Sequence, residues 1–517
     1  MCQFCGVDPA FAAYFDDPNA PTDQSQTGAA DASTPSPAPA VSSTAPNFFR
    51  LKSSNPRYQA GGNGRITTQQ ITTFGSSLSS NSQIYMGHNG QQYTDSLRRW
   101  SKCAEKQALA VVRVGTAEDV AKTVIMCTNH GLPFVAKCGG HSPSGKSSVE
   151  NGIVIDLSLL NNVFVKPDEK QIIAGGGCLS SDVIRAAAEH GLACVTGSTS
   201  HVGIGGLMVH GGYGFLTGEY GLAVDNILAA EVVTAKGQIV WASKEENEDL
   251  FWAIRGAGSK FGIVTKFIIQ AHPVAKEVWR ATLQYSADHL EEVIKALNAW
   301  YEARDPKAAL EFALGKGPDD EACLNVSGFY DGTLSEAEAS FAGLLSLPTT
   351  AKGAEMMPYW KANTLGDVPG LYTGAYIRFA SANIAPLLSV EHLQGALDRL
   401  NTLYETTPAA SATGCLILMV QPNAIMKPSR TDMAFAWRDP NFDTGVAAVF
   451  TDPSLEDQMV AWAQDMAKYL SGKGDAYRLY INHSDFAGPS AREFGINYVQ
   501  LCKLKQKWDP DNHFAKL

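Results

Sequence analysis

A histidine set between small residues is the part of this sequence best suited to bond to a ligand. His141 follows Gly139 and Gly140 and precedes Ser142, so its imidazole stands in a turn without bulky neighbours. A second stretch, residues 197–214, is rich in glycine and poor in charge. Glycine adopts backbone angles that other residues avoid, and its amides can form nests that bind a pyrophosphate. The two stretches indicate a main-chain cradle for a large, flat, anionic cofactor, with one side chain placed to bond to it.

Strands and helices are predicted to alternate around these two stretches. The β-branched run at 108–114 predicts a strand, and Thr116 can cap the helix that follows. Residues 133–137 predict the strand that leads directly into the turn holding His141. Further strands are predicted at 152–158, 171–177 and 261–270, helices at 180–191 and 247–258, and a hairpin over 226–243.

The middle of the chain differs in composition from the preceding part, because it contains few glycines. Apolar residues at helical spacing predict an amphipathic helix over 290–301. Strands are predicted at 415–421 and 445–450, and another helix at 455–470. This part indicates a separate α+β layer whose sheet faces the substrate.

Composition limits the kinds of partner. A chain of 517 residues has room for two or three domains. Its net charge of −11 argues against nucleic acid or an anionic membrane, and no apolar run approaches the roughly 20 residues that span a bilayer. The N-terminus lacks a basic region typical of a secretory signal, so we expect a cytoplasmic protein with reduced cysteines. Cys2 and Cys5 lack a second ligand pair, and no metal site is predicted.

A dinucleotide site of the Rossmann kind is not predicted. Gly203, Gly205 and Gly206 do not give the G-x-G-x-x-G spacing, and Gly211 follows only after four larger residues. We expect no helix to begin inside so many glycines, and no acidic residue follows at the end of a suitable strand. These features exclude NAD as the expected cofactor.

Four segments together resemble the berberine-bridge-enzyme-like oxidases of the vanillyl-alcohol-oxidase superfamily, which have a PCMH-type FAD-binding domain. They are KCGGHSPSG at 137–145, the glycine-rich 195–228, LFWAIRGAGSKFGIVT at 250–265 and GINYVQLCKLKQKWDPDNHF at 495–514. The second segment is especially similar to the nicotine-oxidase subgroup. The resemblance implies an α+β fold: a two-part FAD-binding domain, plus an α+β substrate domain with an antiparallel sheet.

The expected domain boundaries follow from this resemblance and from composition. The first 65 residues hold much Ala, Ser, Thr and Pro and too little apolar surface to offset their ordering entropy. The predicted parts are a mostly disordered tail at 1–65, a lead-in helical segment at 66–104, the FAD-binding domain at 105–273, the substrate-binding domain at 274–470 and a C-terminal segment at 471–517 that returns to the flavin.

The resemblance assigns roles to single residues. His141 would carry FAD through a bond to the flavin 8α-methyl group, and Thr199 replaces the cysteine of many relatives, so we expect one covalent link. Val202 matches a position that controls dioxygen access, with valine typical of oxidases. Lys137 replaces an arginine that could pair with phosphate. The predicted cofactor-binding residues are Lys137, Gly139, Gly140, His141, Ser142, Gly145, Thr199, Val202, Gly203, Gly206, His210, Gly212, Gly214, Ile263, Asn497 and Tyr498.

The catalytic base is expected to be Tyr480, in the sequence Tyr480-Ile481-Asn482. A tyrosine has an ordinary pKa near 10, so it would need a cationic or flavin-side partner to act as a base at neutral pH. An inward-facing aromatic residue on a sheet is an equal alternative. His201, His210 and Tyr213 are other polar candidates on the glycine-rich loop.

The implied function is an FAD-dependent oxidase. An alkaloid or another natural-product intermediate would give a hydride to covalently bound flavin, and dioxygen would reoxidise the flavin. Two alternatives remain: a carbohydrate or alcohol oxidase of the same family, or an inactive flavoprotein that serves as a binding protein. Thr199 counts against the carbohydrate oxidases, which commonly use a doubly linked flavin. The sequence leaves the oligomeric state open.

Overall fold

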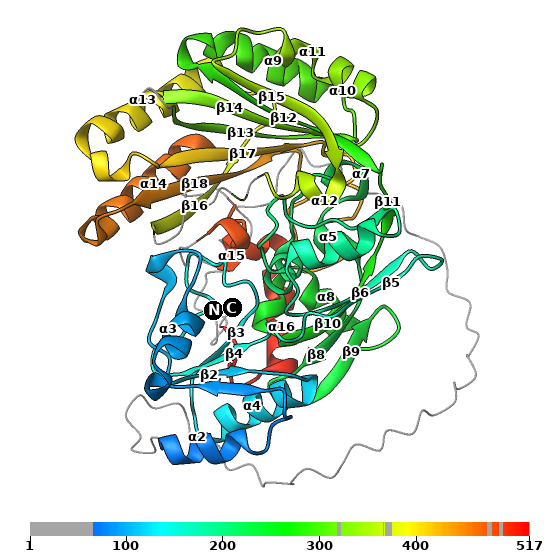
Figure 1. The fold of residues 1–517 in the computed structure, drawn as a ribbon, viewed down its shortest axis with the longest axis vertical. Helices are drawn as coiled ribbons and strands as arrows, with labels where there is room; N and C mark the ends of the chain where they lie inside the picture. Colours follow the sequence, from blue (N-terminus) through cyan, green and yellow to red (C-terminus); the bar gives the residue numbers. More distant parts are fainter. Residues whose placement is uncertain are drawn as a thin grey trace.

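The computed structural model describes residues 66–317, 322–365, 367, 375–472, 478–484, 490–515 and 517. Helices and strands are mixed along the chain, which confirms the predicted α+β class. Figure 1 shows a four-stranded and a five-stranded sheet in the lower body and one large sheet in the upper body. Residues 192–193 and 272–273 pair as a further, two-stranded sheet. The predicted disordered tail at 1–65 lies outside the described residues.

The first sheet has the order β1-β2-β4-β3, in which β2 and β3 run parallel to β4. Thr116 caps the helix between β2 and β3, as predicted, because its side chain accepts a hydrogen bond from the Asp119 amide at 3.2 Å. The lead-in segment also supplies strand β1, which the helical prediction missed. The elements are α2 (Thr68–Gly75), β1 (Gln83–Tyr85), α3 (Gln91–Leu97), β2 (Ala110–Arg113), α4 (Ala117–Asn129), β3 (Phe134–Lys137) and β4 (Ile153–Asp156).

The second sheet is antiparallel, with the order β5-β6-β10-β8-β9. Its strands β8 and β9 form the predicted hairpin, in which Gly237 has a φ of 68°. The elements of this part are β5 (Val163–Lys166), β6 (Gln171–Gly175), α5 (Ser180–Ala188), β7 (Leu192–Ala193), β8 (Ile227–Val233), β9 (Ile239–Ser243), α8 (Glu248–Ala257), β10 (Ile263–Gln270) and β11 (His272–Pro273).

The glycine-rich segment 195–228 contains two short helices, α6 (Ile204–Leu207) and α7 (Thr217–Tyr220). The expectation that no helix begins among these glycines was therefore wrong. Helix α6 is a single turn, closed by a bond from the Leu207 amide to the Gly203 carbonyl at 3.3 Å. Gly203 packs against the backbone of Gly139, and this tertiary contact outweighs the poor helix propensity of glycine.

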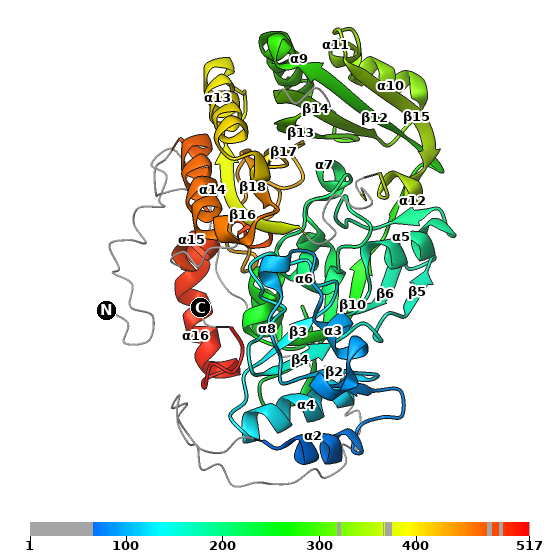
Figure 2. The same cartoon turned by 60° about the vertical axis from the view of Figure 1, so that its left-hand side comes forward.

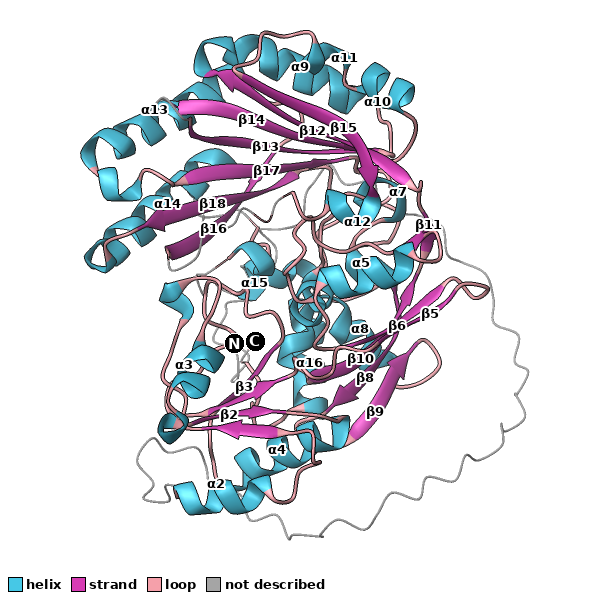
Figure 3. Ribbon diagram, in the orientation of Figure 1, coloured by secondary structure: helices cyan, strands magenta, loops and turns pink. Residues whose placement is uncertain are grey.

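The upper body is built on a seven-stranded antiparallel sheet with the order β15-β12-β14-β13-β17-β18-β16. Five helices cover its outer face, and their apolar side chains share one core with that face (Figure 3). The strands are β12 (Glu277–Ser286), β13 (Ala308–Lys316), β14 (Ala322–Tyr330), β15 (Ala351–Pro358), β16 (Tyr376–Ile384), β17 (Gly414–Val420) and β18 (Phe442–Phe450). The helices are α9 (Leu290–Glu302), α10 (Leu334–Ser340), α11 (Ala342–Leu345), α13 (Val390–Thr406) and α14 (Glu456–Ser471), and the short α12 (Tyr359–Ala362) lies nearer the lower body.

The end of the chain returns to the lower body. Helices α15 (Ser490–Phe494) and α16 (Tyr498–Trp508), red in Figure 2, follow the large sheet. Helix α16 packs on α8, and the Lys507 ammonium lies 2.5 Å from the Asp249 carboxylate on α8. Within the part of the chain that the structure describes, no helix combines the length and the apolar character needed to cross a bilayer.

Candidate active site

A cavity of about 520 Å³ lies between the lower body and the inner face of the large sheet. This volume is typical of sites that hold cofactors or small molecules. Both glycine-rich stretches line the cavity, together with strand β17 and residues 480–483. The predicted site residues on its wall are Gly139, Gly140, His141, Ser142, Thr199, Val202, Gly203, Gly206, His210, Ile263 and Tyr480.

The two glycine-rich stretches meet backbone to backbone. A Cβ atom added at Gly139 would lie 2.5 Å from the Gly203 amide nitrogen, so no larger residue fits there. Gly140 has a φ of 70°, a conformation that favours glycine. Gly206 lines the cavity, and an added Cβ there would meet nothing within 4 Å. The glycines therefore both close the loop and leave room above it.

Main-chain amides in the first turn are available to a ligand. Among the described residues, none accepts a main-chain hydrogen bond from the amides of Gly140, His141 and Ser142. Adjacent amides of this kind suit an anionic group. A phosphate-bearing cofactor such as FAD therefore fits the residues present.

His141 is partly buried and packs against two aromatic rings. Its imidazole stacks on Trp100 with 5.3 Å between ring centroids, and its Nε2 lies 2.5 Å from Nδ1 of His201. Burial, and secondarily the charge of His201, lowers the pKa of His141 to about 3. The imidazole is therefore neutral at neutral pH, which is the state that a nucleophilic nitrogen needs. His201 in turn lies 3.5 Å from the Asp367 carboxylate.

Thr199 and Val202 both lie on the cavity wall. Cys138 also lines the cavity, and the sequence interpretation did not consider it. Burial raises the pKa of the Cys138 thiol to about 11, so it is protonated at neutral pH and a poor nucleophile.

Several predicted cofactor residues support the cavity from outside. Lys137 is not on its wall, because its ammonium pairs with the Asp156 carboxylate at 2.9 Å. Gly145 closes the turn after His141, with a bond from its amide to the Ser142 carbonyl at 3.1 Å. Gly214 packs against the Thr196 carbonyl, which an added Cβ would approach to 1.7 Å.

Asn497 and Tyr498 are buried outside this cavity. The Asn497 side-chain amide donates to the carbonyls of Arg430, Met433 and Ala434 at 2.7, 2.8 and 3.3 Å. In this structure Asn497 therefore orders the loop near residue 433.

His210 holds the glycine-rich loop in shape. Its Nδ1 lies 3.0 Å from the Gly206 carbonyl and its Nε2 lies 2.7 Å from the Ser259 hydroxyl. The carbonyl can only accept, so Nδ1 carries the proton and Nε2 accepts from Ser259. Burial, helped by the charge of Lys146, lowers the pKa of His210 to about 3. With both ring nitrogens engaged, His210 is poorly placed to act as a base.

Tyr480 lies just before the short helical turn Ile481–His483 and not on a strand. Its hydroxyl oxygen accepts hydrogen bonds from the Gly212 amide at 2.8 Å and from the Asn482 side chain at 3.0 Å. Burial, followed by the charge of Asp443, raises the pKa of Tyr480 well above its ordinary value, although the two hydrogen bonds oppose this shift. At neutral pH the side chain is a phenol whose own proton is available to a ligand.

A second polar group, not predicted from the sequence, lies beside Tyr480. His483 lines the cavity, and its Nδ1 lies 2.5 Å from the fully buried carboxylate of Asp443 on β18. The two atoms touch without the alignment of a regular hydrogen bond. A carboxylate beside Nδ1 favours the tautomer with its proton there, which leaves the lone pair on Nε2. The signal in the sequence was the His483 that directly follows Tyr480-Ile481-Asn482.

Comparisons with known proteins place this site in a family. The family described as "FAD binding domain" matches residues 108–243, and the one described as "Berberine and berberine like" matches 479–516. The FAD-linked oxidoreductase pgmH of Aspergillus terreus is 32% identical over 457 residues, which cover 81% of this chain and 89% of that protein. The (R)-6-hydroxynicotine oxidase of Paenarthrobacter nicotinovorans is 36% identical over 424 residues, covering 78% and 89%.

Solved structures agree. The 6-hydroxy-D-nicotine oxidase of Arthrobacter nicotinovorans matches with a TM-score of 0.73 at 25% identity, covering 84% of this chain and 97% of that one. A berberine-bridge-like protein of Physcomitrella patens shares the fold, with a TM-score of 0.76 at 21% identity. The chain therefore belongs to the berberine-bridge-enzyme-like FAD-linked oxidoreductases, as its sequence motifs predicted.

Proposed function

We propose that this enzyme is an oxidase that holds FAD through a single bond to His141 and oxidises an alkaloid or another natural-product intermediate. The observation that carries the proposal is the neutral, partly buried imidazole of His141 beside unpaired main-chain amides on the cavity wall. The amides of Gly140, His141 and Ser142 would bind the anionic part of the cofactor. When bound, the oxidised flavin accepts a hydride from the substrate.

His141 would form the bond through a ring nitrogen. The attacking nitrogen would be the one that carries the lone pair, and the proton on the other ring nitrogen would be released. The bond would also replace one hydrogen of the 8α carbon, so two electrons leave with the two protons, and dioxygen would take them up as peroxide. Thr199 has no thiol, and the Cys138 thiol is protonated, which supports one bond and not two. Trp100 stacks on the His141 ring and would fix its orientation.

Residues 480–483 would orient the substrate and accept the proton that it loses. Tyr480 is a phenol at neutral pH, so its O–H would orient the reacting group of the substrate as a hydrogen-bond donor. His483 has the lone pair that can accept a proton, and Asp443 would stabilise the imidazolium that forms. We therefore assign the base to His483 Nε2 and a positioning contact to Tyr480.

Three observations support an oxidase that acts on an apolar natural product. Leu416 and Leu418 of the large sheet line the cavity, and the 36% identical relative is named as an oxidase of (R)-6-hydroxynicotine. Val202 lies on the cavity wall, and it matches the family position at which a valine is typical of enzymes that react with dioxygen.

The test is anaerobic mixing of the purified enzyme with panels of aromatic amines and of oligosaccharides, followed by admission of air. We expect an amine to bleach the flavin absorbance and air to restore it with release of peroxide. If only the oligosaccharides bleach the flavin, the enzyme is a carbohydrate oxidase and the proposed substrate class is wrong. If dithionite bleaches the flavin but no compound in either panel does, the inactive-flavoprotein alternative is supported instead.

A further inference from the structure

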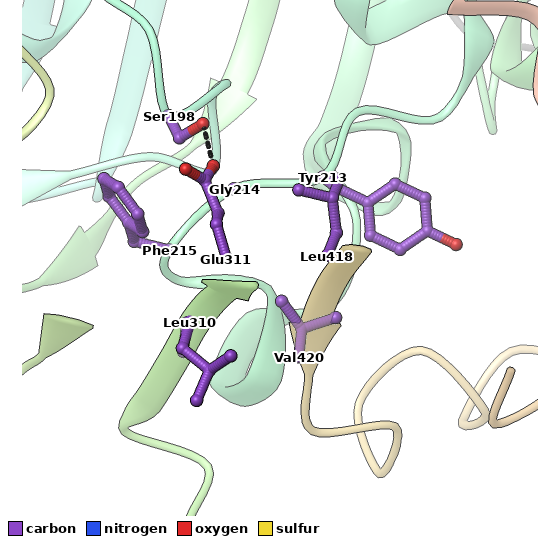
Figure 4. Close-up of a pocket in the computed structure, with 9 residues that line it drawn as sticks. Ser198, Tyr213, Gly214, Phe215, Leu310, Glu311, Leu418 and Val420 are labelled. Atoms are coloured by element: carbon purple, nitrogen blue, oxygen red, sulfur yellow. Dashed lines mark hydrogen bonds between the residues drawn. The ribbon is translucent and has the colours of Figure 1, made fainter. Parts of the chain in front are cut away.

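One carboxylate faces the cavity from the large sheet. Glu311 is the only acidic side chain among the described lining residues, and it lies on β13, the central strand. Side chains alternate along this strand, so Leu310 and Phe312 are buried in the helix-covered core while Glu311 points to the other face. Figure 4 shows the Glu311 side chain rising from β13 toward Ser198, with Leu310 on the opposite side.

Apolar side chains surround this carboxylate. Leu418 of β17 lies directly across from Glu311 in the strand pairing. Leu418, Leu416 and Phe379 all line the same cavity. Phe215 stands on the other side of the Glu311 side chain (Figure 4). An apolar molecule in the cavity could therefore contact these apolar side chains while it lies next to the Glu311 carboxylate.

The carboxylate has unused hydrogen-bonding capacity. The Ser198 hydroxyl donates to its Oε1 at 2.5 Å. A carboxylate can accept about four hydrogen bonds. Arg280 contributes a favourable charge interaction from a distance, but its guanidinium is bonded to the Gly328 carbonyl at 2.8 Å and to the Ser327 hydroxyl at 2.9 Å. Across the described residues, no ion pair reaches Glu311 within 4.0 Å.

This arrangement favours a cationic ligand. A carboxylate that loses water without gaining a partner is strongly destabilised, so a ligand that fills the cavity must supply a donor to Glu311. An ammonium group supplies the strongest such bond, and the leucines favour an apolar body over a polyol. Resting on the proposed function, we propose that Glu311 binds a protonated nitrogen of the substrate, which is an apolar molecule with a basic amine.

The experiment is calorimetric titration of the purified enzyme near neutral pH with matched ligand pairs. Each pair joins an amine to its uncharged ether, such as 4-phenylpiperidine with 4-phenyltetrahydropyran, and the pairs vary in ring size. We expect at least one amine to bind at least about tenfold more tightly than its ether. In Glu311→Gln, which keeps an oxygen for Ser198, this preference should fall below roughly threefold.

Glu277→Gln is the matched control, because it removes the same charge from an exposed position on the same sheet. Glu277→Gln should keep the wild-type preference for the amine. That result would show that the preference does not come from the net negative charge of the protein. The proposal is overturned if no amine is preferred over its ether, or if Glu311→Gln retains the preference. Flavin absorbance is recorded for each sample: wild-type protein without flavin contradicts the proposed function, whereas flavin-loaded protein without an amine preference contradicts only the role of Glu311.

Discussion

Burial sets the protonation of the polar side chains in the cavity. It lowers the pKa of His141 and His210 to about 3, and it raises the pKa of Tyr480. All three are neutral at neutral pH, but their partners differ. His210 has both ring nitrogens occupied, whereas Tyr480 keeps a proton to donate. Burial thus leaves His210 with a structural role, whereas it leaves Tyr480 with a proton that it could donate to a substrate.

Replacement of His483 and of Tyr480 should separate the base from the positioning contact. We expect His483→Gln to slow flavin reduction by roughly 10²- to 10⁴-fold, the range for loss of a general base. Tyr480→Phe should raise the KM for substrate more than it lowers the rate of reduction. Stopped-flow absorbance under anaerobic conditions measures both quantities. If His483→Gln reduces the flavin as fast as the wild type does and Tyr480→Phe does not reduce it, Tyr480 is the base and His483 is not.

Residues close together in the sequence were the predictable part of the site. His141 and its flanking glycines could be identified because one short turn holds all of them. The contact of His483 with Asp443 could not, because β18 and the turn after Tyr480 meet only through the tertiary fold. Trp100 likewise reaches His141 from a segment with no recognisable motif.

At the scale of elements, the site depends on the contact between two glycine-rich turns. Capping by Thr116 and the hairpin of β8 and β9 followed from local patterns and were confirmed. The order of the seven strands has no local signal, because antiparallel partners such as β13 and β17 are far apart in the chain. Helix α6 was missed for a similar reason, since its first turn is stabilised by Gly139 from another segment.

Alanine substitutions at Gly203 and Gly206 should separate two roles of glycine, which are close packing of the loop and space for the cofactor. At Gly203 an added Cβ would lie 2.3 Å from the Gly139 amide, so Gly203→Ala should destabilise the fold by roughly 1–3 kcal/mol. At Gly206 nothing lies within 4 Å, so Gly206→Ala should keep the stability of the fold and bind less flavin. Thermal unfolding and the ratio of flavin to protein absorbance check the two effects. A Gly206→Ala protein that is less stable than Gly203→Ala would contradict the roles assigned to these two glycines.

For the whole molecule, buried neutral histidines tie stability to pH. Unfolded chains bind a proton at histidine near pH 6.5, whereas native His210 does so only near pH 3. Between these values the unfolded state holds more protons, so stability falls as pH falls.

Replacement of His210 tests this linkage. In His210→Asn, we expect the slope of unfolding free energy against pH, between about pH 6 and 4, to decrease by up to about 1.4 kcal/mol per pH unit. Urea unfolding at several pH values measures this slope. His88→Asn, at an exposed position, is the control and should keep the wild-type slope. An unchanged slope in His210→Asn would show that His210 is not buried in its neutral form.

The proposed oxidase depends on a bond between the cofactor and the chain at His141. The most direct measurement is the mass of the acid-denatured protein, followed by peptide mapping. We expect one added FAD per chain, carried by the peptide that contains His141, and none in His141→Ala. Unmodified chain mass with free FAD in solution, or an FAD adduct on another peptide, would contradict the proposed bond.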